Sequence, residues 1–261
     1  MTQGPLISVV IPVFNGEQYV KSCLENMFAQ SYKNLEIIVV DDGSSDRSGQ
    51  IALQYPVKLI RLDENRGLSA ARNTGIDAAS GSYIHFMDVD DGINLEYYQQ
   101  MADAVMATQA DIACGGMLNE KHSYKTWRFK KQVVYHSAKD KLKATFVGKW
   151  GYVWRYLFRL DFIKEQGLRF EEGRFIEDLT FSLPAVYHAK SLVVVPGAEY
   201  IYYHRENSIM SKKDKAHREK RRIDWSHAKA FRKEFARQHN LKIPGIDTGR
   251  FSYLLRKVFL R

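Results

Sequence analysis

Short β-branched runs alternate with helical patterns over the first 116 residues, and this alternation limits the possible folds more than any other feature. The runs predict strands at 7–13, 36–40, 58–62, 83–87 and 111–114. Helical patterns lie between them, at 17–30, 46–54, 68–79 and 95–108. Because such strands are joined by helical crossovers, the pattern predicts an α/β fold with a mostly parallel sheet flanked by helices.

The character of the chain changes after Gly115-Gly116. Residues 117–150 are polar, basic and irregular, which is typical of a connecting segment. Further along, the patterns predict a helix at about 157–166 that ends at Gly167, a helix that begins near Glu177, and a strand at 192–195. We therefore divide the chain into residues 1–116, residues 117–211 of the same domain, and a helical tail, 212–261.

The net charge of +9 is unevenly distributed. Residues 1–116 hold 7 Lys and Arg against 15 Asp and Glu, whereas residues 117–261 hold 32 against 15. An acidic first half argues against a nucleic-acid groove there, because phosphate contacts need Lys and Arg. The basic tail instead favours an anionic surface, such as membrane headgroups, an acidic partner or RNA.

The tail also carries apolar residues at helical spacing, which gives it an amphipathic pattern. The residues of its two stripes are Ile223, Phe231 and Phe235, then Phe251, Leu254, Leu255, Val258 and Phe259. Such stripes suit a membrane surface, a solvated helix or a homodimer contact, and these alternatives stay open.

Cysteine usage and hydropathy indicate a cytoplasmic protein. Cys23 and Cys114 form no Cys-x-x-Cys motif, so neither a disulfide framework nor a thiolate zinc site is expected. The apolar opening run, 6–14, is too short to span a bilayer and lacks the basic flank of a signal peptide.

Acidic residues follow the strand predicted at 83–87. Asp88 and Asp90 are two apart, so both carboxylates project on one side, and their repulsion is relieved by a cation or a proton. Hard oxygen ligands of this kind suit Mg²⁺ or Mn²⁺ bound together with phosphate oxygens. The alternative is a solvated acidic turn with Asp91-Gly92 at its corner.

A second acidic pair, Asp41-Asp42, follows the strand predicted at 36–40. The two side chains point to opposite sides, so one can fix the turn while the other faces a ligand. Neither a G-x-G-x-x-G nor a G-x-x-x-x-G-K-[ST] sequence is present, so the dinucleotide-binding and P-loop interpretations lose their main support.

Five segments of the first half resemble the family-2 glycosyltransferases of the GT-A fold, which have a Rossmann-like sheet. They are ISVVIPVFN at 7–15, QSY at 30–32, VDDGSSD at 40–46, NRGLSAARN at 65–73 and FMDVDD at 86–91. The similarity is looser past residue 116, where VWR at 153–155, FIEDL at 175–179 and YYH at 202–204 fit the family. The resemblance implies an enzyme that transfers a sugar from a nucleoside-diphosphate donor, with inversion, to a saccharide or lipid-linked acceptor.

The resemblance also assigns residues to the donor. It places Pro12, Phe14 and Asn15 along the nucleoside, Asp42 on the base and Asp88 near the ribose. It places Asp90 on a Mn²⁺ or Mg²⁺ ion held by the diphosphate, and Arg72 close to the donor phosphates. Residues 1–116 become the donor half, and residues 117–211 the acceptor and catalytic-base half. For Arg72 the alternative is a surface helix arginine paired with Asp77 or Asp91.

The resemblance makes Glu177-Asp178 the catalytic acidic pair, with Asp178 as general base. A sugar hydroxyl is a poor nucleophile, so a carboxylate must take its proton as it attacks the anomeric carbon. The alternative is that both residues only complement a helix N-terminus. His204 matches a histidine that some relatives use as a further metal ligand, and it otherwise reads as a loop residue.

Four aromatic residues, Trp150, Tyr152, Trp154 and Tyr156, either stack on an acceptor sugar or build a core. Taken together, the sequence favours a metal-assisted, uridine-linked glycosyltransferase at the inner face of a membrane. The alternatives are a sugar-1-phosphate nucleotidyltransferase, and a non-catalytic protein that binds a nucleotide sugar or RNA.

Overall fold

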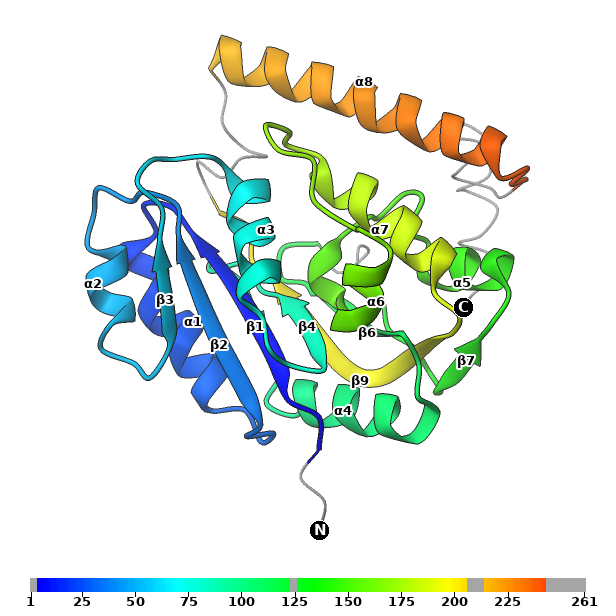
Figure 1. Cartoon of the computed structure of the whole chain (residues 1–261), viewed down its shortest axis with the longest axis horizontal. Coiled ribbons are helices and arrows are strands. Elements are labelled where there is room, and N and C mark those ends of the chain that lie inside the picture. Colours follow the sequence, from blue (N-terminus) through cyan, green and yellow to red (C-terminus); the bar gives the residue numbers. More distant parts are fainter. Residues whose placement is uncertain (1–3, 123–125, 206–213, 243–261) are drawn as a thin grey trace.

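The computed structural model describes residues 4–122, 126–205 and 214–242. At its centre is a nine-stranded sheet in which eight strands follow the order β3-β2-β1-β4-β8-β6-β9-β5 and β7 pairs with β9 (Figure 1). The strands are β1 Ile7–Val13, β2 Leu35–Asp41, β3 Lys58–Arg61, β4 Tyr83–Phe86, β5 Gly92–Ile93, β6 Ile112–Asn119, β7 Val133–Tyr135, β8 Tyr156–Arg159 and β9 Leu192–Tyr202.

Helices cover both faces of this sheet (Figure 1). They are α1 Glu17–Phe28, α2 Ser48–Ala52, α3 Leu68–Ala78, α4 Tyr97–Thr108, α5 Ala138–Thr145, α6 Leu160–Glu165, α7 Glu177–His188 and α8 Lys215–Gln238. Alternate β1 residues point to opposite faces, so Val9 joins the core under α1, α2 and α4. Val10 joins the core under α3, α5, α6 and α7.

The first half follows the sequence pattern. β1 is buried along its whole length because helices cover both sides, and it pairs in parallel with β2 and β4. α3 crosses β1 at a glycine: a Cβ on Gly75 would lie 2.2 Å from Cγ1 of Val10. The predicted alternation of parallel strands and helices up to residue 116 is therefore confirmed, with element ends shifted by a few residues.

The second half departs from the prediction in three places. Residues 117–150 are not irregular throughout, because they complete β6 and form β7 and α5. The helix predicted at 157–166 begins only at Leu160, since β8 takes the preceding residues into the sheet between β4 and β6. The strand predicted at 192–195 continues to Tyr202 because β6 and β5 pair with its later residues, whereas β7 pairs with its first three.

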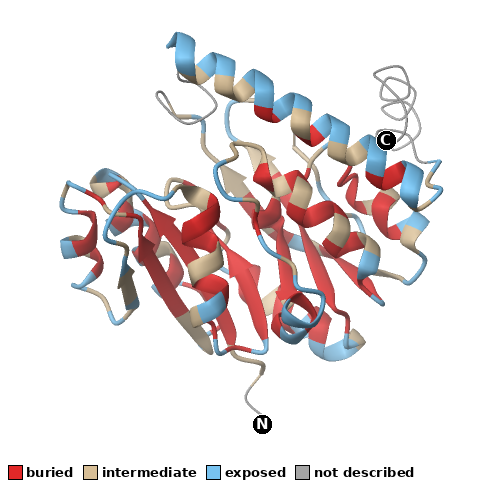
Figure 2. Ribbon diagram, turned by 45° about the horizontal axis from the view of Figure 1, so that its top comes forward, coloured by how far each residue is buried: buried red, intermediate tan, exposed pale blue. Residues whose placement is uncertain are grey.

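The tail helix α8 lies on α7 and is exposed over most of its surface (Figure 2). Its buried residues are Asp224, Ala228, Phe235 and Ala236. The structure divides the stripe of Ile223, Phe231 and Phe235: the Ile223 side chain is 49% exposed, whereas Phe231 and Phe235 pack against the core of the domain. The stripe at 251–259 lies outside the described residues. Among the described helices, none is both long and apolar enough to cross a bilayer.

Candidate active site

The predicted donor residues gather where β1, β2 and β4 end. The loop after β1 is held against the loop after β2: the backbone N–H of Asn15 donates to Oγ of Ser44, and Oδ1 of Asn15 accepts from the backbone N–H of Ser45. Phe14 has 47% of its surface exposed, whereas Pro12 is buried within β1. Only Phe14 and Asn15 of the three thus face solvent at this edge.

Asp42 is buried and fixes the segment that leads into α3. Its two carboxylate oxygens accept from the backbone N–H groups of Arg66 and Gly67, each at 2.8 Å. Burial raises the pKa of Asp42 despite these bonds. Arg66 also lines a hollow of about 350 Å³, together with Arg61 at the end of β3 and the residues that follow it.

Arg72 of α3 connects the two acidic motifs that the sequence singles out. Its side chain is 1% exposed and forms ion pairs of 2.8 Å with Asp88, 2.7 Å with Glu177 and 2.8 Å with Asp178. The alternative of a surface arginine is therefore wrong. Its two suggested partners are engaged elsewhere: Asp77 pairs with Arg169, and Asp91 accepts from Tyr200.

The acidic segment after β4 is not a solvated turn, because Asp91 is buried and Gly92 begins β5. Asp91 accepts hydrogen bonds of 2.9 Å from the hydroxyl of Tyr200 and the backbone N–H of Tyr203. Burial and the neighbouring carboxylates raise the pKa of Asp91, and burial together with Asp88 raises the pKa of Asp90 to about 6. Burial and the close approach of these carboxyl groups therefore disfavour the ionised forms of both Asp90 and Asp91.

Glu177 and Asp178 open α7, and both turn toward Arg72. Asp178 also accepts a long hydrogen bond, 3.4 Å, from the backbone N–H of Val153. Burial raises the pKa of both carboxyl groups, and repulsion between Glu177 and Asp178 raises that of Glu177 further. Both residues do lie at a helix N-terminus, but their shared contact with Arg72 goes beyond a helix-end role.

The structure does not bring His204 into a preformed metal site. His204 is exposed, and its ring centroid lies 6.4 Å from that of His122. In the part of the chain that the structure describes, no three His, Cys, Asp or Glu side chains are grouped so as to hold a metal ion.

The four aromatic residues between Trp150 and Tyr156 lie in different environments. Trp154 and Tyr156 are buried in the core, and Trp150 packs edge-on against Trp127 and Phe146. Tyr152 is partly buried and stacks on Trp154 at 4.9 Å, which in turn stacks on Tyr200 at 4.1 Å. Among the four, Tyr152 alone is partly exposed and also belongs to the aromatic stack that reaches the acidic segment through Tyr200.

Sequence reasoning missed two residues beside this segment, Tyr200 and Arg205. The Tyr200 hydroxyl accepts from the backbone N–H of Asp88 at 3.2 Å and donates to Asp91. The Arg205 guanidinium donates to the backbone oxygen of Asp90 at 3.0 Å and lies 5.0 Å from the ring centroids of both Tyr19 and Tyr203. In the sequence, the alternation of Tyr200 and Tyr202 along a strand is the feature that could have identified Tyr200.

The sheet and its acidic edge define a GT-A fold of the kind found in sugar transferases. The S. aureus TarS fragment 1–349, crystallised with UDP-GlcNAc, shares this fold with a TM-score of 0.74 at 22% identity, covering 87% of this chain and 66% of that one. Residues 8–169 match Glycosyl transferase family 2, and the chain belongs to that family.

Two curated relatives cover most of the chain. An uncharacterized glycosyltransferase of Bacillus subtilis, EpsJ, is 34% identical over 219 residues, 78% of this chain and 63% of EpsJ. The succinoglycan biosynthesis protein ExoO of Rhizobium meliloti is 29% identical over 218 residues, 78% of this chain and 62% of ExoO. The chain spans less than two thirds of the length of either.

Proposed function

We propose that the chain transfers a sugar from a uridine-diphosphate donor to a hydroxyl of a saccharide or lipid-linked saccharide during synthesis of a cell-surface polysaccharide, with inversion. The observation that supports this proposal most directly is the set of ion pairs made by Arg72. They connect Asp88 on the donor side with Glu177 and Asp178 on the acceptor side. The UDP-GlcNAc bound to TarS and the role in the name of ExoO support the donor and product classes.

On the donor side, Phe14 and Asn15 would line the nucleoside, with Pro12 shaping the strand end beneath them. Asp42 would accept from the base while keeping its bonds to Arg66 and Gly67, since a carboxylate has about four acceptor positions. Asp88 would hold the ribose, and its ion pair with Arg72 fixes its orientation. Each of these side chains already lies at one edge of the sheet.

Asp90 has the chemistry of a ligand for a divalent cation, although the described residues do not form a group of three such ligands. Asp88, Asp90 and Asp91 form an acidic cluster in which Asp88 pairs with Arg72, and the charge of Arg205 favours the ionised form of Asp90. Asp90, with His204 as a further candidate ligand, would hold Mn²⁺ or Mg²⁺ once the donor phosphates complete the ligand shell. The bound ion would neutralise the charge that develops on the leaving diphosphate.

Asp178 would act as the base. Its burial raises its pKa above that of an ordinary carboxyl group, so it accepts a hydroxyl proton more readily. The guanidinium of Arg72 favours the ionised form and holds the carboxylate in one orientation. Neither the nucleotidyltransferase nor the RNA-binding alternative gains support from the family match.

The metal proposal predicts that Asp90→Asn folds normally and loses metal-dependent UDP binding. We expect the Mn²⁺-dependent affinity for UDP to fall by at least about tenfold. Loss of a residue that only hydrogen-bonds a metal ligand already lowers metal affinity by about that factor. Calorimetric titration of UDP with and without Mn²⁺ measures this, with Asp103→Asn on the exposed side of α4 as the matched control. Wild-type affinity in Asp90→Asn would exclude Asp90 as a metal ligand.

We further propose that the outer face of α8 binds an anionic membrane surface. The described outer face exposes Arg218, Lys229 and Lys233 beside Trp225, whose side chain is 44% exposed. Two acidic residues of the same helix, Glu219 and Glu234, are each bonded by a neighbouring arginine. The remaining basic charge and the exposed Trp225 suit anionic headgroups.

The triple change Arg218→Gln, Lys229→Gln and Lys233→Gln is therefore expected to weaken vesicle binding. Each basic residue near an anionic leaflet contributes about 1 kcal/mol, so the three together would release most of the protein at low salt. Co-sedimentation with phosphatidylserine vesicles measures this, with neutral vesicles and raised salt as controls. Equal recovery on neutral and anionic vesicles, or none on either, would contradict the proposal.

A further inference from the structure

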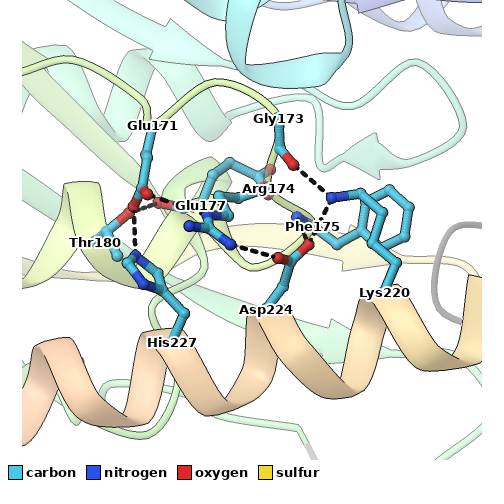
Figure 3. A network of polar contacts seen from close by, with 9 residues as sticks. All are labelled: Glu171, Gly173, Arg174, Phe175, Glu177, Thr180, Lys220, Asp224 and His227. Atoms are coloured by element: carbon cyan, nitrogen blue, oxygen red, sulfur yellow. Dashed lines mark hydrogen bonds and ion pairs between the residues drawn. The ribbon is translucent and has the colours of Figure 1, made fainter.

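Helix α8 contacts the loop that delivers the acidic pair to the site, residues 171–176 (Figure 3). This loop ends one residue before Glu177, so its position determines where Glu177 and Asp178 lie. Figure 3 shows side chains of α8 reaching up to the loop from below, and the loop backbone turning down toward them.

Asp224 is the centre of this contact. It is 2% exposed, and its Oδ1 accepts from Nη1 of Arg174 at 3.0 Å. Its Oδ2 accepts from the backbone N–H of Phe175 at 3.0 Å and from Nζ of Lys220 at 2.9 Å. Three donors thus converge on one buried carboxylate, and two of them belong to the loop.

Two further contacts flank Asp224. His227 forms a 2.7 Å hydrogen bond with Oε2 of Glu171, and Oε1 of Glu171 accepts from Nε of Arg174 at 3.1 Å. Lys220 donates to the backbone oxygen of Gly173 and lies 4.6 Å from the ring centroid of Phe175. The loop is therefore held to α8 at both of its ends.

Apolar packing does not explain how the first half of α8, up to His227, is held against the loop. Its buried apolar residues, Ala228, Phe235 and Ala236, all come after the residues that contact the loop. Phe235 packs edge-on against Tyr187 near the far end of α7, with ring centroids 5.3 Å apart. Beside the loop, Asp224 is the only buried residue of the described helix, so polar contacts position the loop there.

We propose that Asp224 is a positioning residue for the reaction: by holding Arg174 and the backbone of Phe175, it keeps the Glu177-Asp178 pair in contact with Arg72. This inference rests on the proposed function. The ion pairs of 2.7 and 2.8 Å from Arg72 to the acidic pair leave little room for a displaced loop. Misplacement of a catalytic group by about 1 Å costs about a hundredfold in rate.

Asp224→Asn tests the proposal, because the amide turns an N–H₂ group toward a donor in either orientation. The measurement is UDP release by the full chain from UDP-glucose, UDP-galactose and their N-acetylamino counterparts in the presence of saccharide and lipid-linked saccharide acceptors. UDP affinity and amide hydrogen exchange over 171–180 are measured in parallel. We expect kcat to fall about ten- to a hundredfold, with KM for the donor and UDP affinity within about twofold and faster exchange at 171–180.

Glu219→Gln is the matched control, because Glu219 is exposed on the same helix and is bonded to Arg222 within it. It should leave kcat and amide exchange unchanged. Should Asp224→Asn fail to fold, Arg174→Gln removes the same ion pair from the loop, where the side chain is 32% exposed. The same loss of kcat is expected.

The possible failures are distinguishable. Loss of UDP release in the wild-type chain with every donor would contradict the proposed function, and the inference falls with it. An active wild type whose Asp224→Asn variant keeps its kcat would overturn only the positioning role, whether or not amide exchange changes. Equal losses in kcat and UDP affinity would show that Asp224 stabilises the fold in general, and this result would also overturn the positioning role.

Discussion

Asp178→Asn is expected to lower turnover by roughly two to four orders of magnitude, the usual contribution of general-base catalysis, with UDP affinity nearly unchanged. The amide cannot take the proton of the attacking hydroxyl, although it keeps the size of the carboxyl group. The matched control is Asp161→Asn, an exposed acidic residue in the first turn of α6. Steady-state rates of UDP release at a saturating donor concentration provide the measurement.

The pH dependence gives a second check on the same residue. The base must be ionised to act, so turnover falls as the pH drops through the pKa of Asp178. Because burial raises that pKa, the fall should begin at a higher pH than for an ordinary carboxyl group. A variant that loses UDP affinity as strongly as turnover would place Asp178 in donor binding or in the fold, and the base would lie elsewhere.

Arg72→Met is expected to have the largest effect on stability. Met removes the cation and leaves Asp88, Glu177 and Asp178 close together with no counter-charge, which typically costs about 3–5 kcal/mol for a broken buried pair. The three carboxylates are less than a third exposed, so solvent screens this loss only in part. Urea denaturation at neutral pH measures it, and the cost should shrink at acid pH as the carboxylates take up protons.

Arg169→Met is the control for Arg72→Met. Arg169 pairs with Asp77, but the two side chains are 46% and 63% exposed, so its loss should cost less than about 1 kcal/mol. If the two variants had equal stability, Arg72 would not be the counter-charge of the site. Arg72→Lys should fall between them, because one ammonium group cannot match the fork of the guanidinium.

Much of the donor half follows from local pattern. Periods of two and of about 3.6 residues identify strands and helices, and parallel strands place their carboxyl ends at one edge. The sequence alone therefore predicts that Pro12, Asp42 and Asp88 lie close together. The same reasoning failed for β8, because an apolar run such as Tyr156–Arg159 suits a helix or a strand equally, and only its neighbours β4 and β6 decide.

The contacts that define the site depend instead on the tertiary structure. Arg72 lies 105 and 106 positions before its partners Glu177 and Asp178, and no sequence period extends over that distance. Asp224 is 50 positions from Arg174, in a helix whose composition alone indicates a basic, solvent-facing tail. The residue types and their local order are thus determined by the sequence. Which charges face one another is decided by the packing of α3, α7 and α8, because side chains far apart in sequence meet only when the helices that carry them are in place.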